Sequence, residues 1–227
     1  MSPSSKRIHR SLLAACAALA LHSSVALADP TFLGPLPYLS ADDSPFKAEI
    51  DSGSGYLEDF ECGHLVAPGV TADPTALVYG PNFDADSVDG DDGTIDGSGA
   101  NGHSFLRLDA AVITFTFDAD VLGQLPTKAG VVWTDGGTDC DVTFEAFGPG
   151  GVSLGTIFAA GVGDDSNSGT TAEDRFFGVI DSGGIESIRI SHNTGGLEVD
   201  HLQYVVDDLV FRDAFECSTR YWSNVVP

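Results

Sequence analysis

The chain of 227 residues has few basic side chains, since ten Lys and Arg stand against 34 Asp and Glu for a formal net charge of −24. Contacts to phosphate groups need clustered Lys and Arg, so this balance excludes a nucleic-acid-binding protein. It also argues against adhesion to anionic membranes. Hydrophobic residues make up 42% of the chain, too many for a disordered acidic tail. The length predicts one domain.

The sequence also lacks an apolar run long enough to cross a bilayer, which needs about 20 residues. Residues 1–28 have the pattern of a secretory signal peptide, with three basic residues, a short apolar run over 12–20 and the small-x-small site Ala26-Leu27-Ala28. We therefore expect export, cleavage after Ala28 and a secreted, periplasmic or extracellular product without a transmembrane segment.

One alternative to cleavage after Ala28 is lipidation, because residues 13–16 resemble a lipobox ending in Cys16. Only five residues separate Arg10 from Cys16, and apolar sequence continues beyond the cysteine, which favours the ordinary signal peptide.

Cysteine is scarce, and three remain after the signal peptide: Cys62, Cys140 and Cys217. An oxidising compartment permits one disulfide and leaves one thiol over. Phe-Glu precedes both Cys62 and Cys217, and a bridge between them would join the two ends of the domain. The alternative is three free thiols. Zinc is not expected, because no Cys or His lies at close ligand spacing to another.

Helix signals are nearly absent, apart from one short turn expected within 119–125. Short apolar runs alternate with Gly, Asp and Ser clusters, and period-two alternation is clear in 112–117 and 142–147. The glycines of 148–151 predict a hairpin turn. The expected strands are 56–60, 76–79, 104–108, 111–117, 130–134, 140–147, 152–158, 174–180, 185–191, 197–205 and 207–211.

This pattern predicts an all-β fold, an antiparallel β-sandwich of the jelly-roll type found in lectins and carbohydrate-binding modules. The expected sandwich domain spans residues 56–211. Residues 29–55 are rich in Pro, Asp and Ser and are expected to form an N-terminal arm laid over the sandwich. Residues 212–227 form a C-terminal tail.

A dense group of aspartates is the first candidate for an ion site. Its six carboxylates are interleaved with glycines and would repel one another unless neutralised. Hard oxygen ligands on a flexible loop suit Ca²⁺, although the spacing is not that of an EF-hand. The alternative is a solvated acidic loop of a salt-adapted protein. The group consists of Asp84, Asp86, Asp89, Asp91, Asp92 and Asp96.

A second candidate calcium site joins the two ends of the domain. In jelly-roll carbohydrate-binding modules, Phe-Glu on the first strand and an Asp on the last often share a structural calcium, and the present pattern is similar. The alternative is a set of edge charges that face water and discourage strand pairing. The residues are Asp59, Glu61, Asp200 and Asp207, followed by Asp208.

Two motifs resemble catalytic signatures, and neither predicts an enzyme. The string Gly-x-Ser-x-Gly over 151–155 follows a hairpin and enters a strand, whereas a nucleophile elbow must precede a helix. The string over 198–203 resembles the Glu-x-Asp-x-x-Glu pattern of jelly-roll glycosidases. Its last position is Gln203, which cannot donate a proton as an acid would. We therefore expect that the chain is not an enzyme. The remote alternative is a glycosidase.

Four aromatic residues would stack on sugar rings if they were exposed: Trp133, Tyr79, Tyr204 and Trp222. Trp133 lies in an apolar run and is expected in the core.

Several longer strings resemble a group of exported bacterial β-sandwich proteins, many of which carry a PEP-CTERM surface-sorting tail. They include DSVDGDDGTIDGSG (86–99), TAEDRFFGV (171–179) and EVDHLQY (198–204), and the similarity covers residues 31–204. The resemblance implies secretion and a β-sandwich, and no particular activity. The chain departs from the group after Phe211, where Pro-Glu-Pro, a hydrophobic helix and a terminal Arg cluster are all lacking.

The sequence therefore predicts a secreted, non-catalytic module stabilised by Ca²⁺. Its expected partner is a polysaccharide or another cell-surface or extracellular-matrix component. The alternative is a purely structural exported protein whose acidic surface serves solubility in salt.

Overall fold

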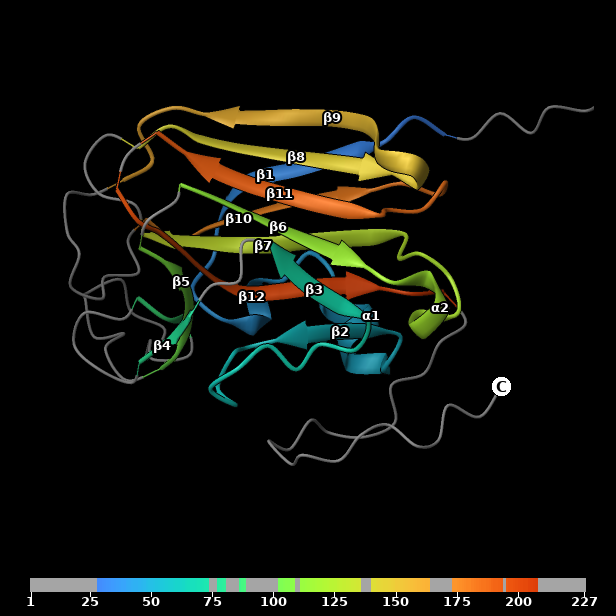
Figure 1. The fold of residues 1–227 in the computed structure, drawn as a ribbon, viewed down its shortest axis with the longest axis horizontal. Helices are drawn as coiled ribbons and strands as arrows, with labels where there is room; N and C mark the ends of the chain where they lie inside the picture. Colours follow the sequence, from blue (N-terminus) through green and yellow to red (C-terminus); the bar gives the residue numbers. More distant parts are fainter. Residues whose placement is uncertain are drawn as a thin grey trace, which may run out of the picture.

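The computed structural model describes residues 28–73, 77–80, 86–88, 102–108, 111–135, 140–163, 173–193 and 195–207. These residues form two antiparallel sheets that face each other (Figure 1). The five-stranded sheet, in front in Figure 1, has the spatial order β3 (Val70–Asp73), β6 (Val112–Phe117), β11 (Ser187–His192), β8 (Val142–Gly148) and β9 (Val152–Ala159).

The second sheet has seven strands and lies behind the first. Its order is β1 (Thr31–Pro37), β10 (Arg175–Ile180), β7 (Lys128–Asp135), β12 (Leu197–Val205), β5 (Ser104–Arg107) and β4 (Leu77–Tyr79), and β2 (Gly55–Glu58) also pairs with β12. From β5 to β8, and again from β9 to β12, each successive strand lies in the opposite sheet. The short helical segments are η1 (Ala41–Asp43), α1 (Lys47–Ser52), α2 (Ala119–Leu122) and η3 (Pro149–Gly151).

The predicted all-β fold is confirmed, and the alternating segments 112–117 and 142–147 are strands β6 and β8. Two strands were not expected from the sequence, namely β1 and β3. Strand β1 contains Pro35 and Pro37, which lack a backbone N–H, and it lies at an edge of its sheet, where proline is tolerated. The segment expected as an arm thus contributes one strand to the sandwich. The tail 212–227 and most of the expected strand 207–211 lie outside the described residues.

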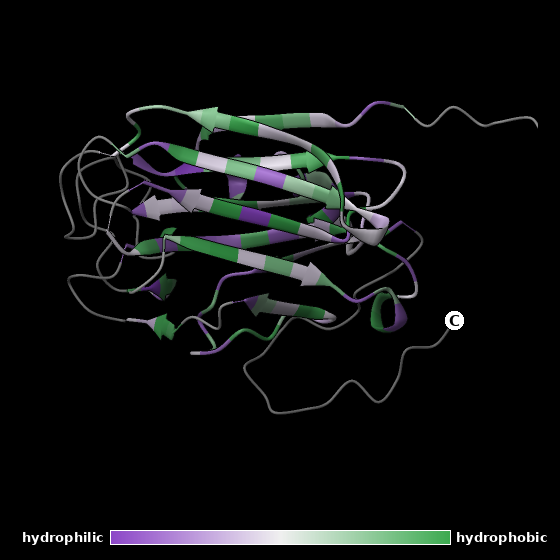
Figure 2. Cartoon of the chain, turned by 45° about the horizontal axis from the view of Figure 1, so that its top comes forward, coloured by the Kyte–Doolittle hydropathy of each residue, from purple (hydrophilic) through white to green (hydrophobic). Residues whose placement is uncertain are grey.

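The main core fills the space between the sheets, because alternate side chains of each strand point inward. From the five-stranded sheet, Phe115 and Phe144 are fully buried, and from the seven-stranded sheet Trp133 and Phe177 meet them in one cluster. Figure 2 shows the resulting alternation of polar and apolar residues along the strands of the five-stranded sheet.

A second, smaller core covers the other face of the seven-stranded sheet. Tyr38 and Phe46 from the N-terminal segment pack there against Phe176 of β10 and Val205 of β12, and Val88 joins them. Tyr38 stacks on Phe176 with 6.1 Å between the ring centroids, and Phe46 meets the same ring edge-on. This face of the sheet is therefore an interior surface.

Strand β12 carries a bulge in its middle. Between Asp200 and Gln203 it advances three residues while β7 advances two, so one residue is extra on β12. His201 has a positive φ of 43°, which is uncommon for a residue with a side chain. On the side of β12 away from β7, residues before the bulge pair with β5 and residues after it pair with β2.

Neither α1 nor α2 approaches the length of a membrane span, and no helix among the described residues is long and apolar enough to cross a bilayer.

Candidate functional site

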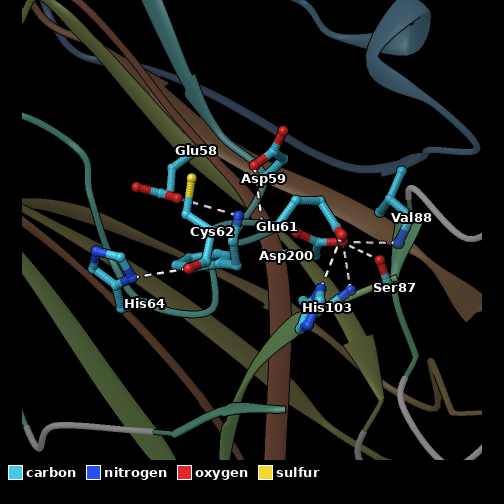
Figure 3. Close-up of polar contacts among 10 residues, drawn as sticks. Glu58, Asp59, Glu61, Cys62, His64, Ser87, Val88, His103 and Asp200 are labelled. Atoms are coloured by element: carbon cyan, nitrogen blue, oxygen red, sulfur yellow. Dashed lines mark hydrogen bonds and ion pairs between the residues drawn. The ribbon is translucent and has the colours of Figure 1, made fainter. Parts of the chain in front are cut away.

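The predicted ion ligands after β2 make contacts within the protein. Asp59 Oδ1 accepts a hydrogen bond from the backbone N–H of Glu61 at 3.1 Å. The Glu61 carboxylate accepts the backbone N–H of His103 and lies 2.9 Å from its Nδ1 (Figure 3). Because His103 directly precedes β5, Glu61 ties the turn after β2 to the start of that strand.

The predicted ligand Asp200 is fully buried and holds the segment 86–88 against β12. Its Oδ2 accepts the Ser87 hydroxyl at 3.1 Å and the Val88 N–H at 2.9 Å (Figure 3). On the same strand, Glu198 Oε1 accepts the Asp86 N–H at 3.0 Å and the Ser104 hydroxyl. These two carboxylates therefore serve as hydrogen-bond acceptors for a loop that lies more than 100 residues away in the sequence.

Neither predicted calcium site is established by the structure. Among the described residues, no group of three or more His, Cys, Asp or Glu side chains is arranged to hold a metal ion. A site that joins Asp59, Glu61, Asp200 and Asp207 to Asp208 therefore stays a prediction. The backbone carbonyl of Asp207 accepts a hydrogen bond from the Gln124 amide. Five aspartates of the acidic loop, and Asp208, lie outside the described residues, so calcium binding there stays a prediction: Asp84, Asp89, Asp91, Asp92 and Asp96.

Two buried glutamates have raised pKa values. Burial raises the pKa of Glu58 to about 7 against the backbone N–H groups that bond to its carboxylate. Burial likewise raises the pKa of Glu198 to about 7, and Asp135 adds to the shift. Glu58 accepts the N–H of Phe60 at 3.1 Å through Oε1 and that of Val66 at 2.7 Å through Oε2. It therefore organises the turn after β2, a role that no pattern in the sequence indicated.

The string that resembled a glycosidase signature belongs to a buried network. Gln203 Oε1 accepts the Ser44 hydroxyl, and its Nε2 donates to Tyr38 Oη at 2.9 Å. Tyr38 Oη in turn lies 3.0 Å from His201 Nδ1. Which of these two groups donates depends on the tautomer of the imidazole. The network fastens the N-terminal segment to β12 and gives Gln203 a structural role.

The cysteines and aromatic residues divide between core and surface. Cys62 is disulfide-bonded, and Cys140 is a buried thiol whose Sγ lies 3.3 Å from His192 Nδ1. The predicted pairing of Cys62 stays a prediction, because Cys217 lies outside the described residues, as does Trp222. Trp133 is fully buried, as expected. Its Nε1 donates to His192 Nδ1 at 3.3 Å, and burial lowers the pKa of His192 to about 4.

Tyr204 is also a core residue, which excludes it as an exposed platform for a sugar ring. Its hydroxyl donates to the carbonyl of Pro68 at 2.8 Å. Tyr79 ends β4 and is half-buried.

The outward side chains of the five-stranded sheet form a continuous surface that we call the hydroxyl face. Strand register places them in three rows, and eight of the fourteen are Ser or Thr. Side chains on neighbouring strands lie about 5 Å apart and successive rows about 7 Å apart. The rows are Phe158, Thr143, Ser191 and Val112; Thr156, Glu145, Arg189, Thr114 and Asp73; and Ser153, Phe147, Ser187, Thr116 and Thr71.

Arg189 lies at the centre of the hydroxyl face and is held on three sides. Its Nε donates to Thr114 Oγ1 at 3.3 Å, and one terminal nitrogen lies 3.4 Å from Glu145 Oε2. Its guanidinium carbon lies 5.0 Å from the centroid of the Phe147 ring. A planar group stacked on a ring in this way presents an ordered surface. At the edge of the face, Phe158 is 63% exposed.

One end of the hydroxyl face continues into an open hollow of about 440 Å³. Thr71 and Thr116 of the face line it, together with the hairpin at Pro149. Three carboxylates also line the hollow, those of Asp118, Asp120 and Glu186. The Asp118 carboxylate accepts the Asp120 N–H, and the Glu186 carboxylate accepts the Gly151 N–H, so two of the three are fixed in place.

The sequence contained a signal for this face that identified the strands but not the surface. Alternation in 112–117 and 142–147 marks Thr114, Thr116, Thr143 and Glu145 as outward residues. That they adjoin Arg189 and Phe158 depends on strand register, which the alternation alone does not determine.

No model of a known protein family matches the chain, and none of the curated proteins matches it. Two solved structures are similar to part of the chain. One is the carbohydrate-binding module TmCBM61 in complex with β-1,4-galactotriose, at 13% identity and a TM-score of 0.36 over 65% of this chain and 94% of that one. The other is the enzymatically active domain of tailspike protein 4 of bacteriophage CBA120, at 11% identity and a TM-score of 0.31 over 65% of this chain and 20% of that one. Likeness at this level carries no argument about fold or function.

Proposed function

We propose that this chain is an exported, non-catalytic module that binds a polysaccharide across its hydroxyl face. The observation that carries the proposal is the concentration of Ser and Thr around a fixed Arg189–Glu145 pair, on a sheet face that no described element covers. The signal-peptide pattern of residues 1–28 supports export.

The chemistry of the hydroxyl face matches that of a sugar chain. Each Ser or Thr hydroxyl both donates and accepts, as each sugar hydroxyl does. Bridging waters extend the reach of short side chains at such surfaces. The exposed ring of Phe158 offers an apolar contact for the C–H face of a sugar. Because the side chains stand on strands, little ordering entropy is lost on binding.

The absence of catalysis is part of the proposal. Glycoside hydrolysis needs two carboxyl groups on either side of a bond that the substrate can reach. The carboxylates that resembled this signature, Glu198 and Asp200, are at most 3% exposed and accept hydrogen bonds from the segment 86–88. They are better explained as structural acceptors.

Affinity electrophoresis of the mature chain in gels that contain single polysaccharides tests the proposal. We expect at least one polymer to retard the protein. Phe158→Ala should weaken the retardation about fivefold or more, the effect of losing one exposed aromatic contact. Leu108→Ala is the matched control, because Leu108 is 70% exposed and follows β5 of the other sheet. Retardation by no polymer would refute the binding role and favour a purely structural exported protein.

We also propose that the acidic stretch 84–96 binds Ca²⁺ and stabilises the domain. Its support is compositional, because six aspartates interleaved with glycines supply the oxygen ligands that a hard cation prefers. Extracellular calcium modules bind at roughly 10⁻⁴–10⁻³ M, so about 10 mM Ca²⁺ should stabilise the fold by up to about 2.7 kcal/mol. Thermal melts in EGTA, Ca²⁺ and equimolar Mg²⁺ test this. Equal shifts with both ions would show screening of a solvated loop instead of a site.

A further inference from the structure

Among the described residues of the hydroxyl face, Arg189 is the only Arg or Lys. The carboxylate of Glu145 lies next to it and opposes its positive charge. Glu145 Oε2 lies 3.4 Å from the guanidinium, and both side chains remain partly exposed, at 43% for Arg189 and 31% for Glu145. Thr114 and the Phe147 ring fix the guanidinium plane from two other sides. The group thus presents N–H donors with little net positive charge.

The surroundings of this pair are acidic. Asp73 lies in the same row as Arg189, two strands away, and the adjoining hollow has three carboxylates and no Lys or Arg in its lining. The whole chain carries a net charge of −24. A polymer of uronic acids approaching the face would therefore meet like charge, which lowers both its association rate and its affinity.

We infer that the hydroxyl face selects neutral polysaccharides, and that Glu145 is the residue that keeps Arg189 from binding the carboxylates of acidic ones. This inference rests on the proposed function and names its ligand class. Arg is the side chain best suited to bidentate recognition of a carboxylate, so an unopposed Arg189 would favour uronates. With Glu145 in place, the guanidinium donates to sugar hydroxyls, and acidic chains are rejected by repulsion.

The test compares three proteins on neutral β-glucan, neutral β-galactan and polygalacturonate. Glu145→Gln removes the opposing charge and keeps the size of the side chain. Asp73→Asn is the matched control, because it makes the same change in net charge on the same face without touching Arg189. Affinity electrophoresis at low and at moderate salt provides the readout, and circular dichroism checks that each variant is folded.

We expect the wild type to be retarded by a neutral polymer, with little dependence on salt, and not by polygalacturonate. Glu145→Gln should gain polygalacturonate binding of about fivefold or more, the effect of one partly exposed charge interaction, and lose it as salt rises. Asp73→Asn should gain little. Equal gains in both variants, or no gain in Glu145→Gln, would overturn the role of Glu145.

The remaining outcomes separate this inference from the proposed function. A wild type that binds polygalacturonate as well as a neutral polymer overturns the selectivity and leaves polysaccharide binding intact. A wild type that binds no polymer refutes the proposed function, while a gain confined to Glu145→Gln would still support the role of Glu145.

Discussion

The raised pKa of Glu198 makes folding stability depend on pH at one identified side chain. Burial in the middle of the seven-stranded sheet raises the pKa of Glu198 from 4.5 to about 7. Two donors, the Asp86 N–H and the Ser104 hydroxyl, both bond to Oε1. At about pH 5–6 the carboxylate is largely ionised in the unfolded chain but largely protonated in the native protein, and near pH 7 about half of the native molecules keep the proton.

The sign of the effect follows from proton linkage. Because the native protein holds the proton more tightly, the contribution of Glu198 to stability is fully present below pH 4.5 and is lost as the pH rises through about 7. A shift of about 2.5 pKa units corresponds to a loss of about 3 kcal/mol. The lowered pKa of His192, about 4, acts in the opposite direction below pH 6.5, so the wild-type profile alone does not isolate the glutamate.

The substitution Glu198→Gln isolates the contribution of this glutamate to the pH dependence of stability. The amide oxygen can accept both hydrogen bonds in place of Oε1, and the amide nitrogen takes the place of Oε2. We expect the variant to match the wild type within about 1 kcal/mol near pH 4.5 and to be more stable by about 2–3 kcal/mol at pH 8. Urea unfolding at a series of pH values, followed by the fluorescence of buried Trp133, measures the difference.

The same substitution at a second glutamate, Glu58, should have the opposite effect on stability. Glu58 also has a pKa of about 7, but it accepts backbone N–H groups through both oxygens, so an amide nitrogen would face a donor. Glu58→Gln should therefore destabilise the fold by about 1–3 kcal/mol even at pH 8. If Glu198→Gln is instead less stable than the wild type at pH 8, the hydrogen bonds to the ionised carboxylate outweigh its burial and the reasoning fails.

Three further predictions concern packing and connectivity. Tyr38→Phe removes the hydroxyl that bridges two buried side chains of β12, and should cost about 1–3 kcal/mol in urea unfolding; an unchanged midpoint would show that the bridge contributes nothing. Gly130→Ala would place a Cβ 2.3 Å from the Phe176 ring, so the melting temperature should fall by an amount equivalent to about 1–3 kcal/mol or more. Peptide mapping without reduction should recover Cys62 linked to Cys217, and recovery of Cys62 with another partner would contradict the sequence prediction.

The regular part of the fold was predictable because it depends on local alternation. Strands β6 and β8 each place every second residue in one core, and this pattern is visible in any window of six residues. Strand β1 was not predictable in the same way. Its prolines are unfavourable in a strand, and only its edge position next to β10 makes them acceptable.

The buried carboxylates show a second limit of prediction from the sequence. Short Asp and Glu patterns indicated metal ligands, whereas Asp200 accepts hydrogen bonds from Ser87 and Val88, 113 and 112 residues distant. A carboxylate has the same sequence signature whether an ion or a backbone amide neutralises it. Whether an ion or a backbone amide neutralises the carboxylate depends on which loop the fold places against it. The topology of the two sheets determines that loop.

The bulge in β12 separates two properties that a strand normally couples, its length and the direction in which its side chains face. Leu197, Val199, Leu202 and Tyr204 all point into the core, a spacing that strict alternation would not allow without the extra residue. A chain that lacked His201 would regain regular alternation and keep these four residues inside. It would lose the imidazole that contacts Tyr38, while the hydrogen bond from Gln203 to Tyr38 and the pairing of β1 with β10 would still hold the N-terminal segment on the sheet.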